Sequence, residues 1–363
     1  MRLNSLFGGK YCRGISLVVL ITLTALCGAQ IRAIGQVNTE SERSASEIEP
    51  LTTSDRWKSA RLLHTLKGHR ATVHAVVFSP DSKIIASGSG NNEARIKFWD
   101  VEKRRELIWQ DFRAQRVSVL TMASNPQQEV LISSGEDNSI NLWNWKTRES
   151  QRIFVDNFSS ILSLKISPDR GVLVGGGLDG IRVWDARFDR PIYTLAGIGN
   201  PTHALAISPN GHILASGDNL GRVRFWDLRE GKLISEFFPH QETISGLIFT
   251  PDGNSLITSS HDRTIKAWDL TTEQLSYTLI GHTEKIRAIA ITRDGTTLAS
   301  ASNDGIRVWE VKSGKLLNRF LGHEDWVASL AFSPNGRLLA SGGFDTNILV
   351  WGTFIPGETR IEY

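Results

Sequence analysis

Residues 327–351 read VASLAFSPNGRLLASGGFDTNILVW, which is three short apolar segments separated by two polar turns. The segments are Val327–Phe332, Leu338–Ser341 and Ile348–Trp351. The first turn, SPNG, carries Pro and Gly at positions that favour a tight turn, and the second is FDTN. Apolar runs of this length between turn residues are typical of strands. The stretch therefore predicts an antiparallel meander of three strands that ends at a tryptophan.

The same unit recurs along the chain. One tryptophan closes each unit, at intervals of 41 to 44 residues: Trp99, Trp143, Trp184, Trp226, Trp268, Trp309 and Trp351. A turn after the first strand repeats at 41 to 46 residues, with Arg293 replacing proline once: Pro80, Pro126, Pro168, Pro209, Pro251, Arg293 and Pro334. Two independent landmarks with a common period indicate a repeat fold of seven units.

A fourth strand lies between each tryptophan and the next unit, as at residues 274–279. Four strands with their turns account for the period. Such a small sheet cannot bury both faces alone, and packing sheets around a ring solves this while leaving only short edges. We therefore predict an all-β, seven-bladed β-propeller of four-stranded antiparallel blades.

The order of strands also predicts how the ring closes. A strand at residues 62–66 precedes the first unit, and the last unit ends after its third strand. We expect the N-terminal strand to complete the last blade. The propeller would span residues 61–355, with repeats at about 62–103, 108–147, 152–188, 193–230, 235–272, 277–313 and 318–355.

The units resemble WD40 repeats. The dipeptide that names the family stands at Trp99-Asp100, Trp184-Asp185, Trp226-Asp227 and Trp268-Asp269, and its Gly-His stands at Gly68-His69, Gly281-His282 and Gly322-His323. The dipeptide is altered at Trp143-Asn144, Trp309-Glu310 and Trp351-Gly352. The chain resembles in particular the bacterial single-propeller WD40 proteins with an N-terminal export signal. The motif is specific for the fold and says little about function, because one fold serves many functions.

The resemblance implies a structural hydrogen-bond network of a His, a Ser or Thr, an Asp and a Trp within one repeat. The matching residues are His240, Thr258, Asp262 and Trp268; His282, Ser300, Asp304 and Trp309; and His323, Ser341, Asp345 and Trp351. Repeats two to four lack the histidine, so we expect them to be less tightly held. A Ser-His-Asp set also suggests catalysis. A triad needs to occur once, however, and this set recurs, so we expect no catalytic residue and no metal or other cofactor.

The resemblance also implies a partner-binding face, which carries the loops entering each innermost strand and those between the second and third strands. The candidate contact residues are Trp326, Phe344, Lys285, His261, Asn303 and Glu324. Exposed aromatic side chains are common anchors of interfaces. We expect a monomeric, non-catalytic scaffold that binds a protein or peptide. An enzyme or a small-ligand binder that uses the central channel is the alternative.

Charge argues against nucleic acid as the partner. The chain has 41 basic and 38 acidic residues, and removing Arg2, Lys10 and Arg13 leaves 38 of each. A neutral body has no net field that would attract nucleic acid or anionic lipid.

The N-terminus predicts export. Three basic residues precede the apolar run ISLVVLITLTALC at 15–27, and cleavage after Ala29 fits the small-x-small rule. Residues 1–29 would then be a signal peptide, 30–60 a flexible polar linker and 356–363 a C-terminal tail. An uncleaved membrane anchor and a lipidated Cys27 stay open as alternatives. We expect an exported protein of the periplasm, the cell envelope or the extracellular space.

Overall fold

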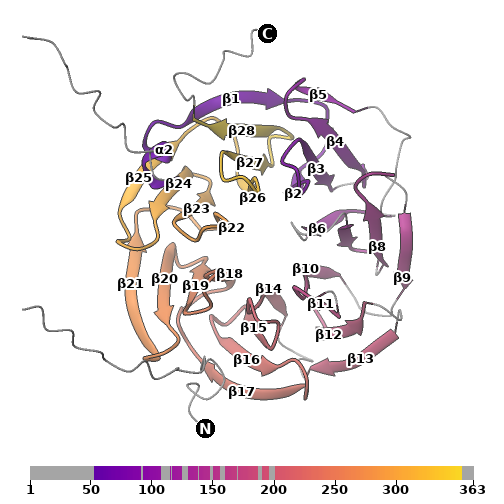
Figure 1. Cartoon of the computed structure of the whole chain (residues 1–363), viewed down its shortest axis with the longest axis vertical. Coiled ribbons are helices and arrows are strands. Elements are labelled where there is room, and N and C mark those ends of the chain that lie inside the picture. Colours follow the sequence, from indigo (N-terminus) through magenta and orange to yellow (C-terminus); the bar gives the residue numbers. More distant parts are fainter. Residues whose placement is uncertain are drawn as a thin grey trace, which may run out of the picture.

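The computed structural model describes residues 53–90, 93–107, 115, 117–124, 130–137, 139–147, 150–155, 160–169, 171–186, 190–195 and 201–353. Seven four-stranded antiparallel sheets stand around a central opening (Figure 1). The predicted seven-bladed propeller is therefore confirmed. The expected signal peptide, the linker up to residue 52 and the C-terminal tail lie outside the described residues.

Blades 1 to 7 follow the chain, and each contributes one strand to each of four concentric positions. The innermost strands are β2 (Val73–Phe78), β6 (Val119–Ser124), β10 (Ile161–Ile166), β14 (Thr202–Ile207), β18 (Ile244–Phe249), β22 (Ala288–Ile291) and β26 (Val327–Phe332). The second strands are β3 (Ile84–Ser89), β7 (Val130–Gly135), β11 (Val172–Gly177), β15 (Ile213–Asp218), β19 (Ser255–Ser260), β23 (Thr297–Ser302) and β27 (Leu338–Gly343).

The third and outermost strands complete each blade. The third strands are β4 (Ile96–Asp100), β8 (Ser139–Asn144), β12 (Gly180–Asp185), β16 (Val223–Asp227), β20 (Thr264–Asp269), β24 (Gly305–Glu310) and β28 (Ile348–Gly352). The outermost strands are β5 (Arg105–Glu106), β9 (Ser150–Val155), β13 (Arg190–Leu195), β17 (Lys232–Phe237), β21 (Gln274–Ile280), β25 (Leu316–Phe320) and, for blade 7, β1 (Arg61–Leu66).

The core consists of the layers between neighbouring blades. All six residues of β15 are buried, because this strand has a blade on each side, whereas β17 is half-exposed. At some positions in these layers, neighbouring blades pack so closely that no side chain larger than a hydrogen atom fits. A Cβ at Gly217 would overlap with the side chain of Ile244 in the next blade, and one at Gly342 would lie 2.6 Å from Val73. Glycine is thus required where adjacent sheets approach most closely.

The ring closes between its two ends. Strand β1 pairs antiparallel with β28, with Arg61 opposite Gly352 and Leu66 opposite Ile348. In Figure 1, β1 is the outermost strand of the blade that contains β26, β27 and β28. The predicted closure is confirmed. The C-terminal repeat supplies three strands of the last blade, β26, β27 and β28, and the N-terminal strand β1 supplies the fourth.

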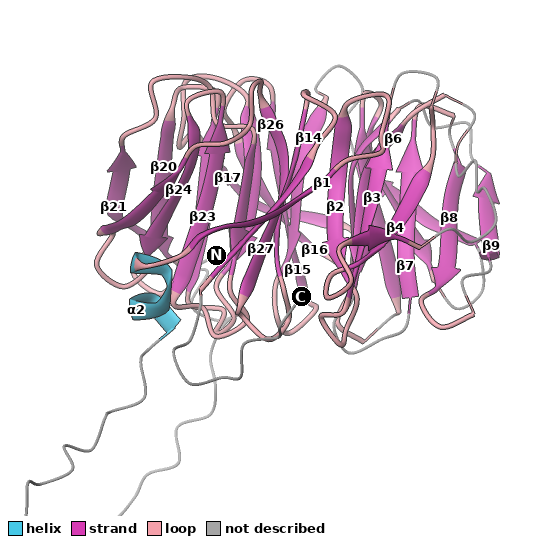
Figure 2. Cartoon of the chain, turned by 90° about the horizontal axis from the view of Figure 1, so that it is seen from above, coloured by secondary structure: helices cyan, strands magenta, loops and turns pink. Residues whose placement is uncertain are grey.

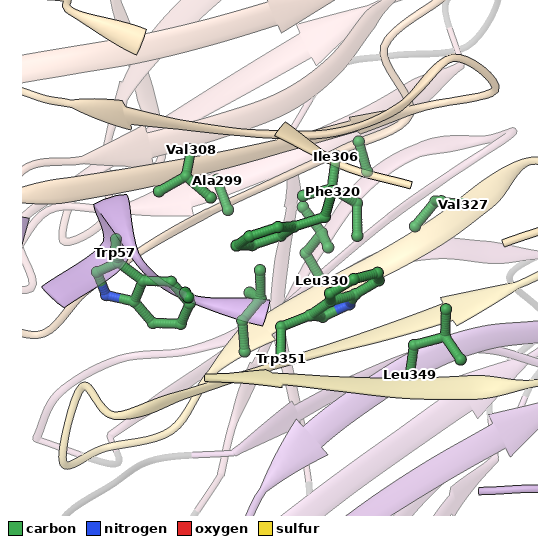
Figure 3. Close-up of a cluster of buried hydrophobic side chains, with 12 residues drawn as sticks. Trp57, Ala299, Ile306, Val308, Phe320, Val327, Leu330, Leu349 and Trp351 are labelled. Carbon is green, nitrogen blue, oxygen red and sulfur yellow. The ribbon is translucent and has the colours of Figure 1, made fainter. Parts of the chain in front are cut away.

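A short helix corrects the predicted linker. The range 30–60 was expected to be flexible, but helix α2 (Thr53–Lys58) lies within it and buries Trp57 to 1% exposure. Figure 3 shows Trp57 in the cluster between blades 6 and 7, where Phe320 lies between it and Trp351. The Trp57 ring meets Phe332 edge-on at a centroid distance of 5.0 Å. The sequence places Trp57 near the end of the polar segment as a residue that could pack on the propeller, and its burial stabilises the helix against the ring.

The strands run between two opposite faces of the disc (Figure 2). We call one of them the loop-bearing face; it carries the connections from each outermost strand to the next blade and those between second and third strands. The described residues include no helix that is long and apolar enough to cross a membrane.

Candidate functional site

The three predicted polar sets are hydrogen bonded within their blades. In blade 5, His240 Nδ1 lies 2.8 Å from Asp262 Oδ2, and His240 Nε2 lies 2.8 Å from Thr258 Oγ1. The indole N–H of Trp268 donates to the same hydroxyl at 3.3 Å. The hydroxyl therefore links the histidine to the tryptophan.

Blades 6 and 7 repeat the arrangement. His282 lies 2.6 Å from Asp304 and 2.7 Å from Ser300, which accepts from Trp309 at 2.9 Å. In blade 7 the corresponding members are His323, Ser341, Asp345 and Trp351, with distances of 2.8 to 3.0 Å.

Blade 1 contains a fourth set that the sequence analysis missed. His69 lies 3.1 Å from Glu93 and 2.6 Å from Ser87, and Trp99 donates to Ser87 at 2.7 Å. Glutamate replaces aspartate, and it lies 24 residues after the histidine, compared with 22 in blades 5 to 7. The His–Ser spacing of 18 residues, which is shared by all four sets, was the available signal.

Blades 2 to 4 keep less of the network. Ser133 accepts from Trp143 at 2.9 Å and Ser216 accepts from Trp226 at 2.8 Å, in both cases without a histidine. Blade 3 has Gly175 at the hydroxyl position, where a Cβ would lie 2.9 Å from the Trp184 ring. In blade 2 the side-chain oxygen of Gln115 accepts from Ser139 Oγ at 2.6 Å, so what the described residues of blades 2 to 4 lack is the histidine link.

The ionisation of the network fits a structural role. Burial raises the pKa of Asp304 and Asp345, but hydrogen bonds from the histidine and from backbone N–H groups outweigh it and hold each pKa at about 2. Burial lowers the pKa of His282 to about 4. The His240 and His282 side chains are at most 1% exposed, so no substrate reaches them. Each hydroxyl also accepts an indole N–H, so the bonds of all four members of a set are made within the blade.

On the loop-bearing face, the structure brings Trp326 and Phe344 together around an arginine. The guanidinium carbon of Arg287 lies 4.7 Å from the centroid of Trp326 and 5.1 Å from that of Phe344. The backbone N–H of Phe344 donates to the carbonyl of Trp326 at 2.8 Å, which ties the two loops of blade 7 to each other. We call Arg287, Trp326 and Phe344 the cation–π cluster. Arg287, directly before β22, is not among the predicted contact residues, which include Lys285 of the same loop.

The other four predicted contact residues lie in loops of the same face, in blades 5 to 7. Lys285, Asn303 and Glu324 are exposed, and His261 is half-buried. His261 lies close enough to Lys285 and Arg287 for both charges to lower its pKa, after burial as the main cause. The Lys285 carbonyl accepts from Ser302 Oγ at 2.8 Å, which fixes its loop.

Three exposed apolar side chains that the sequence analysis did not single out lie near the outer edge of the same face. Phe238, Ile280 and Leu321 are 63%, 77% and 66% exposed. Each stands one residue before the Gly-His or Pro-His dipeptide of its repeat. That shared position was the signal that could have found them.

The central channel encloses about 700 Å³ and is lined by residues of the innermost strands and by loop residues at its mouth. Its lining includes His74, His203, His261, Arg287 and Lys165. No group of three or more His, Cys, Asp or Glu suited to a metal ion occurs among the described residues.

Comparison with known proteins agrees with the geometry. The model of the family described as WD domain, G-beta repeat matches residues 60–100, 108–144, 189–227, 231–269, 273–310 and 314–352, which together exceed half of the chain. The repeat without a match is blade 3, where Gly175 stands at the hydroxyl position.

Several eukaryotic proteins are similar to part of the chain. Periodic tryptophan protein 2 of Arabidopsis thaliana is 30% identical over 44% of this chain and 18% of its own length. Transducin beta-like protein 3 of Bos taurus is 28% identical over 46% of this chain and 22% of its own. Small ribosomal subunit protein RACK1 of Neurospora crassa is 32% identical over 28% of this chain and 32% of its own length. The matched region thus spans about a third or less of these relatives.

Proposed function

Because the chain belongs to the WD40-repeat family, we propose that it is a non-catalytic scaffold that binds a protein or peptide on its loop-bearing face, centred on blades 5 to 7. The observation that carries this proposal is the cation–π cluster of Arg287, Trp326 and Phe344. Aromatic and arginine side chains are the residue types that contribute most to interface affinity.

The surroundings of the cluster support the same face. The exposed polar side chains of Lys285, Asn303 and Glu324 would form the rim, and Phe238 and Leu321 add apolar area farther out. Apolar anchors within a polar rim are typical of protein interfaces. The anchors project from a closed ring, so little conformational entropy is lost when a partner binds.

The polar network supports a scaffold over an enzyme. Four sets of the same composition, buried between strands, are explained by the need to satisfy polar groups in the interior. A catalytic site would instead place its nucleophile where substrate can reach it.

The proposed location is the cell envelope or the exterior, with the chain acting as a monomer. The support is the basic and then apolar pattern of residues 1–29, which an export signal requires. Any membrane attachment would occur through that segment alone.

The experiment is partner capture from the native envelope fraction by the purified propeller and by the double variant Trp326→Ala/Phe344→Ala. Loss of two anchors at about 2 kcal/mol or more each would weaken binding by well over 30-fold. The melting temperature should remain unchanged, because both side chains are only half-buried.

The matched control is Leu275→Ala/Leu316→Ala, which removes two exposed apolar side chains from the outermost strands β21 and β25. This control should capture partners as the wild type does. Full retention of partners by the Trp326/Phe344 variant would rule out this face.

A further inference from the structure

Five basic side chains of the described residues face the central channel. His74 and His203 are the second residues of the innermost strands β2 and β14, and Arg287 directly precedes the innermost strand β22. These three therefore share one level near the loop-bearing face. His261 joins them from the loop between β19 and β20, and Lys165 lies three residues deeper on β10, or about 10 Å along the strand.

None of these five side chains hydrogen bonds to, or forms an ion pair with, any residue that the structure describes. The described lining of the channel contains no Asp or Glu. The nearby Asp218 is already engaged, because its carboxylate binds Arg222 at 2.9 Å and Arg224 at 3.6 Å. The lining of the channel therefore concentrates basic groups, and the carboxylates that act on them lie outside it; the one that acts on Arg287 is Asp325, whose charge partly offsets the lowering of the Arg287 pKa by burial.

The charges around each histidine are mixed. The charge of Asp218 favours the protonated form of His203. For His261, Glu242 favours the protonated form, and the positive charges of Lys285, Arg287 and His203 oppose it. Glu136 favours protonation of His74 and Arg287 opposes it. Burial is the largest influence on all three, and it lowers each pKa below the ordinary value of 6.5. The imidazoles are therefore mostly neutral at pH 7.

We propose that the mouth of the channel binds a small oxyanion, a carboxylate or phosphate group, held by Arg287 together with His203 and His261. The guanidinium supplies donors in a plane, which suits oxyanion geometry, and the two imidazoles supply further N–H donors. Lys165 lies deeper in the channel, where burial lowers its pKa and so disfavours its charged form; the proposed site therefore does not include it. This site shares Arg287 with the cation–π cluster, but binding of a free oxyanion can be measured without any protein partner.

Sulfate is the probe, because its charge does not change between about pH 5 and 8 and it has the same oxygen geometry as phosphate. Titration calorimetry of the purified protein at constant ionic strength should show saturable binding. Binding should also take up protons, because an anion favours the charged form of a histidine. With one proton taken up, affinity should rise by up to about tenfold per pH unit as the pH falls from about 8 to 6.

Two variants test the assignment. Arg287→Gln should weaken sulfate binding about tenfold or more, as expected for loss of a charge-assisted hydrogen bond. His261→Gln should leave binding detectable but reduce the proton uptake. Lys312→Gln, which removes a charge from the exposed β24–β25 loop on the opposite face, should have no effect. Unchanged melting of all three variants excludes unfolding as the cause.

The oxyanion could be a free small molecule or an acidic or phosphorylated side chain of a partner. Partner capture in sulfate and in chloride of equal ionic strength separates these sources, because only a partner-borne anion is displaced by sulfate specifically. Absence of saturable sulfate binding at pH 6, or binding that Arg287→Gln leaves unchanged, would overturn the proposal. Either result would leave the protein-binding face intact, since that is tested by the Trp326/Phe344 variant.

Discussion

Substituting the shared hydroxyl of the polar network by alanine should destabilise blade 6 more than blade 4. Ser300 and Ser216 are both the fourth residue of a second strand, and both are buried. Ser300 bonds to His282 and Trp309, whereas Ser216 bonds only to Trp226. The same chemical change therefore removes two buried partners in one blade and a single partner in the other.

The magnitude follows from the number of polar atoms left unpaired. Each buried donor or acceptor that loses its partner costs about 1–3 kcal/mol. Ser216→Ala should therefore lower the free energy of unfolding by about 1–3 kcal/mol, and Ser300→Ala by about 2–6 kcal/mol. Urea denaturation followed by tryptophan fluorescence measures both values against the wild type. Equal losses in the two variants would refute the claim that the histidine link stabilises its blade.

Two further predictions concern closure and acid stability. Deleting residues 61–67 removes the strand that pairs with β28, so the melting temperature should fall sharply; an unchanged melting temperature in calorimetry would count against closure as a stabilising feature. Glu93, Asp304 and Asp345 have folded-state pKa values of about 2, below their ordinary values, so their stabilisation is complete above about pH 4.5 and is lost as the pH falls towards 2. Each should contribute about 1–2 kcal/mol after screening, and Asp345→Asn should flatten this part of the stability–pH profile.

The fold could be predicted because its determinants are local and periodic. Each tryptophan recurs at the same place relative to a turn, and the strand at 62–66 stands where a fourth strand stands in later units. Ring closure then follows from counting strands. The helix at Thr53–Lys58 could not be predicted in this way, because it depends on one contact: Trp57 fills the space between blades 6 and 7.

The candidate site was only partly predictable. Trp326 and Phe344 are large residues at predicted loop positions, and the structure places both rings close to one guanidinium. Arg287 was missed, because sequence position does not indicate which side chain of a loop turns towards the neighbouring blade. The blade 1 network was missed because Glu93 reaches from a longer loop to the place that aspartate occupies elsewhere.

The pairing of β1 with β28 has a consequence for biosynthesis. Arg61 leaves the ribosome early, but its partner Gly352 is among the last residues of the propeller to be translated. Blades 1 to 6 can each assemble from contiguous chain as it emerges, whereas blade 7 must wait for both ends. Until then, β1 has no partner strand and offers an unpaired edge to other nascent chains. Completion of the disc thus comes after the other six blades have been translated, and a chaperone bound to the first strand would delay it.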